Sequence, residues 1–466
     1  MKLIPTLRDL LQPVNRLPPE TISHIARYFT NNDTTGDVRS MIPLTHVCRY
    51  WRESIISTPE NWTSISSKSK SLAELSLQRA KATDLDIRLN MAQINKSPGF
   101  SDLLAPYIQN TKTLRVHFGS TQEFARTLPD FPQSMPNLRS LSLIGKVCDW
   151  DWSTDAFGPL TTLAHLTLVY VPLWPSFLHL RTLTDLTLDY FRCNLHLDTL
   201  LYLLEENRSL ERATLGMMFP GPSFRSSRRQ VPIRNRLQSL TITFPSTMDA
   251  HALMSSLALQ RGARLKITLC RAISGLNDVL PIISMAHLSN LQSPTLMECD
   301  PNRNTIRLLG PNGSFSFCAT GLESLLAGFP PAHLTDVREF RHLGSGMVSY
   351  PLKPVAFVLA LPALEALTIK CEHVLSPLFS TLFSNPSSSP SLKTLAFLDC
   401  TLGEDFMEEL TQFASNRKNS TSAWLYRVVI INSQGSLPGI ASIGALRKHV
   451  SVVDVQIGDK LPADLI

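Results

Sequence analysis

Short segments in which apolar and polar residues alternate recur along most of this chain of 466 residues. Alternation with a period of two places one set of side chains on one face of a β-strand, so each segment predicts a half-buried strand. The segments with this pattern are 85–89, 114–118, 138–143, 163–168, 183–188, 237–242, 364–369 and 392–397. The last aliphatic residues of seven successive strands, at positions 143, 168, 188, 215, 242, 269 and 296, differ by 25, 20, 27, 27, 27 and 27. A nearly constant period of this size predicts a solenoid of structural repeats.

One copy of the repeat is complete. Leu392, Leu395, Phe397, Cys400 and Leu402 occupy the positions of the leucine-rich repeat consensus, so this copy resembles that repeat class. Each strand would be followed by a turn and a returning helix, and the apolar spacing predicts helices over 72–82 and 101–109. We therefore predict an α/β fold over residues 66–466: a curved leucine-rich-repeat solenoid with a parallel sheet on its concave face.

The repeats are interrupted between Leu296 and Ile369. In this gap Asn312-Gly313 lies between two alternating apolar segments, which is the strongest short-range signal for a β-hairpin. We expect a hairpin near 305–319, inserted between repeats, and two further strands over 425–431 and 450–457. Cys299 and Cys400 each lie three residues after a strand-ending aliphatic residue, where we expect them to bond the turning backbone.

Residues 14–65 follow a different pattern, with helical rather than alternating spacing. Pro18, Pro19 and Glu20 are typical of the first turn of a helix, and the apolar stripe that follows is Ile22, Ile25, Ala26 and Phe29. A second stripe consists of Leu44, Val47, Cys48, Trp51 and Ile55. We predict a small all-α module at 14–65, preceded by an N-terminal tail at 1–13. About fifty residues bury little core, so such a module is suited to completing its core against a partner.

The strings 17–25 and 44–52, with Trp62 after them, together resemble an F-box. The family motif is Leu-Pro-x-Glu with spaced aliphatic residues, followed by an aliphatic-Val-Cys-x-x-Trp helix. The stretch Thr30–Met41 between the two strings is longer than the usual linker. The resemblance implies binding to a Skp-type adaptor, which tethers an F-box protein to a cullin scaffold and a ubiquitin-conjugating enzyme. The adaptor-binding positions it implies are Leu17, Pro18, Glu20, Ile22, Ile25, Leu44, Val47, Cys48, Trp51 and Trp62.

These positions have two interpretations. Ile25, Val47 and Trp51 fit the module's own core better than direct contact, whereas Leu17 and Pro18 precede the first helix and fit exposure to a partner. Cys48 fits a small buried apolar residue better than a reactive thiol.

Composition agrees with a repeat protein and argues against several other classes. Leucine occupies 73 positions and charged residues only 18%, while the net charge of +6 is far below what nucleic-acid binding through phosphates requires. The eight cysteines show neither a disulfide framework nor a zinc module, and no apolar run is long enough to span a bilayer. The common hydrolase, zinc-protease and nucleotide motifs are absent. We expect a non-enzymatic cytoplasmic or nuclear protein without metal or cofactor, binding neither nucleic acid nor membrane.

One acid-free stretch, Arg212–Met248, concentrates positive charge. It is either a flexible solvated insertion or a contact for an acidic or phosphorylated partner, because arginine forks bind phosphate at two points. Its candidate residues are Arg225, Arg228, Arg229, Arg234 and Arg236. The sequence as a whole predicts a substrate-recruiting subunit of an SCF-type ubiquitin ligase, with an unidentified protein substrate on the repeats. The alternative is a leucine-rich-repeat scaffold without a role in ubiquitination.

Overall fold

The computed structural model divides into two compact units, Met1–Cys193 with Tyr202–Leu210 and Asn194–Leu201 with Glu211–Ile466. The residues described are 16–32, 38–97, 99–119, 135–146, 160–171, 173, 175–189, 197–216, 236–244, 251–254, 257, 259–270, 293–300, 305–318, 334–343, 361–370, 379, 382–383, 389–420, 424–432 and 438–457. The predicted tail at 1–13 lies outside these residues. Each unit combines a mostly parallel sheet with helices, so the mixed α/β class is confirmed.

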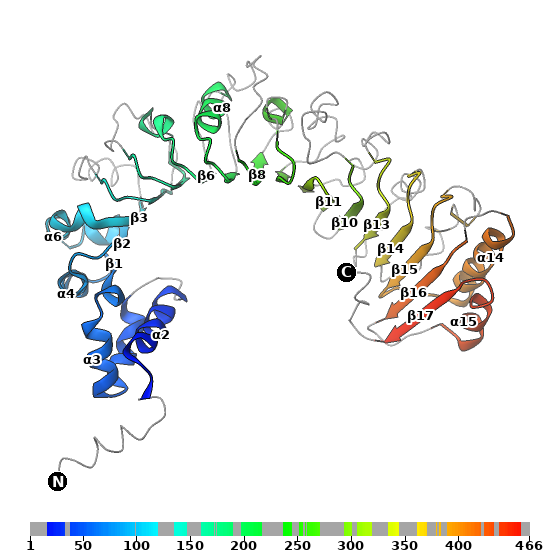
Figure 1. The fold of residues 1–466 in the computed structure, drawn as a ribbon, viewed down its shortest axis with the longest axis horizontal. Coiled ribbons are helices and arrows are strands. Elements are labelled where there is room, and N and C mark those ends of the chain that lie inside the picture. Colours follow the sequence, from blue (N-terminus) through cyan, green and yellow to red (C-terminus); the bar gives the residue numbers. More distant parts are fainter. Residues whose placement is uncertain are drawn as a thin grey trace, which may run out of the picture. The chain divides into compact units, whose positions relative to one another are not determined.

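The first unit begins with a helical module, as the apolar stripes predicted (Figure 1). Its elements are α2 (Pro19–Asn32), the 3-10 helix η2 (Val38–His46), α3 (Arg49–Ser57) and the 3-10 helix η3 (Pro59–Trp62). The expectation of one continuous helical stripe from Leu44 to Ile55 is wrong. The backbone of Cys48 is extended, with φ of −159°, so the helical conformation is interrupted before α3. The Val47 side chain is therefore exposed to solvent and does not pack in the core.

Polar contacts of buried and half-buried side chains tie the module together. The Tyr50 hydroxyl donates to the carbonyl of Leu17 at 2.8 Å, which fixes the chain that enters α2. The Trp62 indole donates to the carbonyl of Ile55 at 3.1 Å, and the Arg79 guanidinium lies 4.2 Å from the centre of the Trp62 ring. Arg79 belongs to α4 (Lys70–Ala80), so Trp62 links the module to the next helix.

Six parallel strands form the described sheet of the first unit, in chain order. They are β1 (Ser64–Ser66), β2 (Leu85–Asn90), β3 (Thr111–His117), β4 (Ser140–Ile144), β5 (His165–Val169) and β6 (Asp185–Asp189). The helices among them are α4, α5 (Met91–Ile94), α6 (Phe100–Leu104), η4 (Ala105–Asn110) and η6 (Pro175–His179). The predicted domain boundary between residues 65 and 66 falls inside β1, which pairs with β2. The end of the module therefore supplies the first strand of the sheet.

Hydroxyl side chains connect successive repeats just before their strands. Thr162 donates to the carbonyl of Leu138 at 2.9 Å, and Thr182 donates to the carbonyl of Leu163 at 2.7 Å. Ser209 repeats the contact with Leu183 at 3.0 Å. Each hydroxyl thus satisfies a turn carbonyl of the preceding repeat, a role that would otherwise fall to water.

The sheet of the second unit does not follow chain order throughout. The spatial order is β7, β8, β9, β12, β11, β10, β13, β14, β15, β16 and β17. These strands are β7 (Arg212–Leu215), β8 (Ser239–Phe244), β9 (Arg264–Leu269), β10 (Leu296–Asp300), β11 (Thr305–Gly310), β12 (Gly313–Cys318), β13 (Glu339–His342), β14 (Ala366–Lys370), β15 (Thr394–Leu398), β16 (Arg427–Asn432) and β17 (Val452–Ile457). The helices with defined bounds in the described part of this unit are α14 (Glu404–Ser420) and α15 (Ile440–Leu446), and the division between the units passes through α8 (Leu197–Glu206).

The predicted hairpin is confirmed as β11 and β12, and it lies within the sheet. Strand β12 pairs in parallel with β9, whereas β11 is antiparallel to both of its neighbours. The turn differs from the prediction by one residue, because Gly310 pairs with Gly313 and the two loop residues are Pro311 and Asn312. Proline favours the first central position of a turn, which explains the shift. Gly310 has no room for a side chain, since a Cβ there would lie 2.9 Å from the Ser293 carbonyl oxygen.

The strand register corrects the predicted spacing of the repeats. Ile242 pairs with Ile267, so the equivalent position in β9 is Ile267 rather than Leu269. Cys299 lies inside β10 and pairs with Ile306 and His342, so its predicted role in a turn is wrong. Burial, with a smaller effect of the neighbouring Asp300, raises the pKa of the Cys299 thiol to about 12. His342 of β13 pairs with Cys299 and is half-buried, and burial lowers its pKa.

The last repeats carry apolar residues on both faces of the sheet. The ring centre of Phe397 on β15 lies 5.5 Å from that of Phe406 on α14 and 5.6 Å from that of Phe379. The face of the sheet that carries Phe397 therefore packs against α14 (Figure 1). Because side chains alternate along a strand, the neighbouring residues face the other way. A second buried cluster on that side consists of Ala396, Leu398, Val429 and Ile431. The predicted turn role of Cys400 is confirmed: its thiol donates to the carbonyls of Leu398 and Ile369 at 3.3 and 3.4 Å.

Candidate interaction surfaces

The ten residues predicted for adaptor binding divide by exposure into three groups. Pro18, Glu20 and Val47 are exposed, while Leu17, Ile25, Leu44 and Cys48 are half-buried. Ile22, Trp51 and Trp62 are buried, with at most 5% of each residue accessible. These three therefore form the interior of the module and do not offer a contact surface. Cys48 is half-buried at the start of α3 rather than fully enclosed.

The surface of the module carries four large apolar side chains, of which the sequence pattern did not single out Tyr28 and Ile42. Tyr28 is 68% exposed, Phe29 50% and Val47 53%, and Ile42 of η2 also reaches the exposed range. Single exposed apolar residues are common on protein surfaces, but four within so small a module make its surface a candidate for contact with a partner. The helical spacing assigned Phe29 to the core stripe, and the break at Cys48 that exposes Val47 has no clear sequence signal.

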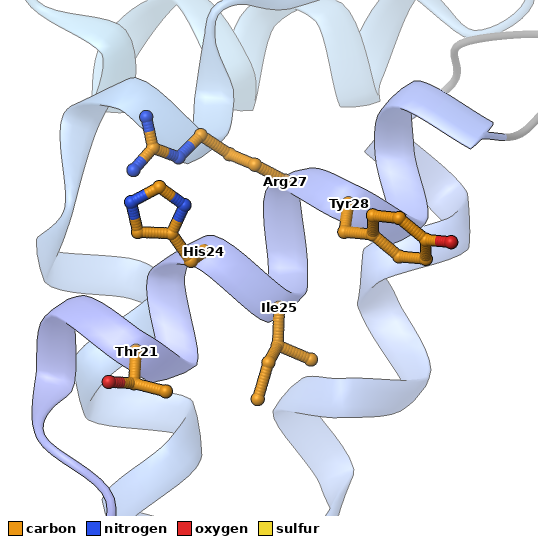
Figure 2. A pocket seen from close by; sticks show the side chains of 5 residues that line it. All are labelled: Thr21, His24, Ile25, Arg27 and Tyr28. Atoms are coloured by element: carbon orange, nitrogen blue, oxygen red, sulfur yellow. The ribbon is translucent and has the colours of Figure 1, made fainter.

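One face of α2 borders an open depression of about 540 Å³. Its lining residues are Thr21, His24, Ile25, Arg27 and Tyr28, which recur at the three- and four-residue spacing of one helix side. Figure 2 shows the side chains of His24 and Arg27 next to one another. Ile25 and Tyr28 point away from this pair on the same helix. The depression thus combines apolar side chains with the ring and guanidinium nitrogens of His24 and Arg27, which can donate hydrogen bonds. This mixture suits a protein segment with apolar anchors and hydrogen-bond acceptors.

The arginine-rich stretch is only partly described. Arg236 is exposed just before β8, whereas Arg225, Arg228, Arg229 and Arg234 lie outside the described residues. The predicted contact with an acidic partner at this stretch stays a prediction.

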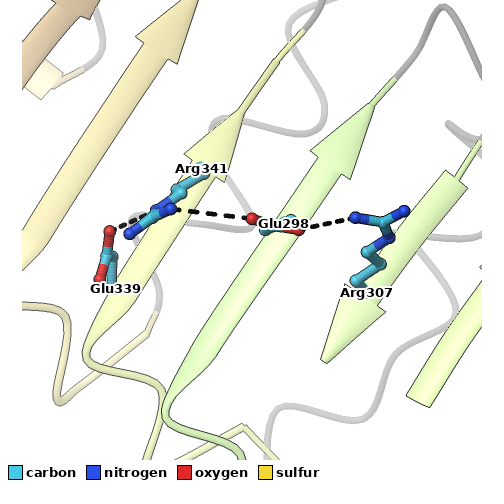
Figure 3. Close-up of polar contacts among 4 residues, drawn as sticks. All are labelled: Glu298, Arg307, Glu339 and Arg341. Atoms are coloured by element: carbon cyan, nitrogen blue, oxygen red, sulfur yellow. Dashed lines mark hydrogen bonds and ion pairs between the residues drawn. The ribbon is translucent and has the colours of Figure 1, made fainter. Parts of the chain in front are cut away.

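The sheet face opposite the buried leucines carries charges that sequence reasoning did not connect. In the second unit Glu298 accepts ion pairs from Arg307 at 3.5 Å and from Arg341 at 3.8 Å, and Arg341 also contacts Glu339 at 2.5 Å (Figure 3). Glu298 lies on β10, which pairs with β11 on one side and with β13 on the other, so the three strands bring these residues into one row. The strand register places Arg307, Glu298 and Arg341 directly opposite one another across the three strands.

The described part of the chain contains no group of three or more His, Cys, Asp or Glu side chains placed to hold a metal ion. Among the described helices, none is long and apolar enough to cross a membrane. No protein-family model matches the chain, and a search of curated proteins finds no similar sequence.

Proposed function

We propose that this protein is an F-box subunit that recruits a protein substrate to an SCF-type ubiquitin ligase. The module would bind a Skp-type adaptor, and through it a cullin scaffold, while the repeats bind the substrate. The observation that carries the proposal is the exposure of Pro18, Tyr28, Phe29 and Val47 on a helical module whose motif resembles an F-box. A small module that leaves such side chains accessible is suited to a permanent partner.

In this proposal the chain performs no chemistry of its own. Holding a substrate lysine near a ubiquitin thioester raises its effective concentration, and proximity alone accelerates the transfer. The buried residues Ile22, Trp51 and Trp62 support the module, while exposed and half-buried residues such as Pro18, Val47 and Leu17 contact the adaptor. The open sheet faces, with their polar and charged side chains, provide the surface for a substrate.

The proposal predicts that the full chain co-purifies with a Skp-type adaptor and that Val47→Glu weakens the complex. Burying a new carboxylate in an apolar contact should cost about 2 kcal/mol or more, roughly thirty-fold in Kd. Leu17→Ala with Pro18→Ala should weaken it as well, because both residues precede α2 at the module surface. Binding is measured by titrating purified adaptor against each variant.

Ile440→Glu provides the matched control, because Ile440 is an exposed aliphatic residue of the second unit. It should bind the adaptor as tightly as the unaltered chain. Absence of any complex, or equal affinity of the Val47→Glu and Ile440→Glu variants, would contradict the adaptor role and favour the scaffold alternative.

A further inference from the structure

An open depression of about 620 Å³ lies on the charged sheet face of the second unit, where the hairpin enters the sheet. This volume lies within the range of about 300–1,000 Å³ that is usual for ligand pockets. Its side chains include Arg264 of β9, Arg307 of β11, and Ser314 and Ser316 of β12. The described residues that line it all lie between Gly262 and Ser316.

Positive charge converges on this depression. Lys266 pairs in register with Ser316, which pairs with Arg307, so Lys266 and Arg307 are two strands apart. Neighbouring strands are about 4.8 Å apart, which places these two backbones about 10 Å from one another. Arg264 lies two residues before Lys266 on the same face of β9. Long side chains can close around one anion across such a distance.

No acidic side chain opposes these cations on their own strands. The residues of β9, β12 and β11 that alternate with the buried ones are Arg264, Lys266, Thr268, Ser314, Ser316, Cys318, Thr305, Arg307 and Leu309. None of the described acidic residues forms an ion pair with Arg264 or Lys266. Arg307 has one acidic contact, a long one of 3.5 Å to Glu298, and its side chain remains 50% exposed.

The edge of the depression is held in place by backbone contacts. The amide of Gly262 donates to the carbonyl of Asn312 at the hairpin turn, at 2.7 Å. Gly310 lies directly against the backbone of Ser293 and Pro294. Because the turn is anchored on both sides, the arginine and serine side chains project from a preorganised frame, which lowers the entropic cost of binding.

We propose that this depression binds a phosphate ester on a protein partner. Two guanidinium groups and two hydroxyl groups line the depression, and Lys266, paired in register with Ser316, adds an ammonium group on the same sheet face beside it. Together they match the charge and the acceptor oxygens of a phosphate dianion better than a single carboxylate. The positive area is three strands wide, and Glu298 and Glu339 lie beside it on β10 and β13. Such a short positive area suits one dianion rather than the repeated charges of a nucleic acid.

This phosphate site rests on the proposed function in one respect: the phosphorylated partner is taken to be the substrate that the protein recruits. Its test does not involve the adaptor, so the two can fail separately. The probe is a fluorescent pool of peptides with one fixed phosphoserine flanked by randomised residues, titrated against the full chain by fluorescence polarisation. Matched pools carry serine or glutamate at the fixed position, and a single-stranded RNA oligonucleotide is the polyanion probe.

The phosphoserine pool should bind at least ten-fold more tightly than either matched pool and more tightly than the RNA. Arg264→Gln and Arg307→Gln should each weaken that binding about ten-fold. Arg115→Gln, at an exposed position of β3 in the first unit, should leave it unchanged. Equal binding of the phosphoserine and glutamate pools, tighter binding of the RNA, or affinity that survives both arginine replacements would overturn the proposal.

Discussion

Replacing Arg417 by Met is expected to lower the free energy of unfolding by about 3 kcal/mol or more. The Arg417 side chain on α14 is 1% exposed, and it donates to the carbonyls of Ser389, Pro390 and Leu392 at 2.9, 3.3 and 3.0 Å. Burial lowers the pKa of Arg417, but a guanidinium group stays charged in proteins. Methionine fills similar space and cannot donate, so buried carbonyls in the turn before β15 lose their partner.

Urea denaturation followed by circular dichroism measures the effect, and hydrogen exchange locates it. Because each repeat contacts only its neighbours, faster exchange should concentrate in β14, β15 and β16. Lys418→Met is the matched control, since the adjacent Lys418 donates to the Lys448 carbonyl from an exposed position. That variant should change stability by about 0.5 kcal/mol or less. Similar midpoints for the two variants would show that the arginine contacts do not stabilise the fold.

Replacing Phe397 by Ala should destabilise the second unit by about 3–5 kcal/mol, the usual range for an aromatic residue in a core. Phe397 is 1% exposed and contacts the rings of Phe379 and Phe406. Its removal leaves a cavity between β15 and α14 that neighbouring repeats cannot fill. Thermal and urea denaturation of the purified variant measure the loss.

Phe397→Leu serves as the comparison, because leucine keeps most of the apolar contact. Its cost should be only about 1.5 kcal/mol, because leucine leaves a much smaller cavity than alanine does. If Phe397→Ala and Phe397→Leu unfold at the same urea concentration, the aromatic cluster does not hold α14 on the sheet.

The strands were predictable because a period of two in the sequence directly reports burial on one face. Leu166 and Leu168 of β5 illustrate this, since both are buried and Thr167 between them is not. Strand order was harder. Asn312 and Gly313 indicated the hairpin, but its position inside the sheet depends on the pairing of β12 with β9, which lies far upstream in the sequence.

Features that depend on long-range polar contacts were not predictable. Arg417 looks like an ordinary basic residue near the end of a helix, and only the fold brings the turn before β15 to it. The break at Cys48 interrupts an apolar stripe that is regular in sequence. By contrast, Thr162 and Thr182 each precede a buried leucine, and this repeated pair is a signal from which their hydroxyl contacts could have been inferred.

The candidate site was partly predictable for the same reasons. Exposure of Pro18 follows from its place before the first helix, where there is little chain to cover it. Trp62 is buried because Arg79 covers its ring and the carbonyl of Ile55 accepts its indole N–H. The sequence around Trp62 does not reveal these contacts, so its burial could not be predicted. The charged row containing Glu298 and Arg341 required the register of strands that the hairpin separates.

The most direct test of the proposed function is hydrogen–deuterium exchange of the full chain with and without a purified Skp-type adaptor. We predict slower exchange within residues 16–62, around α2 and the start of α3, and unchanged exchange in β2 to β17. No protection anywhere, or protection limited to the strands, would contradict an F-box role for the helical module.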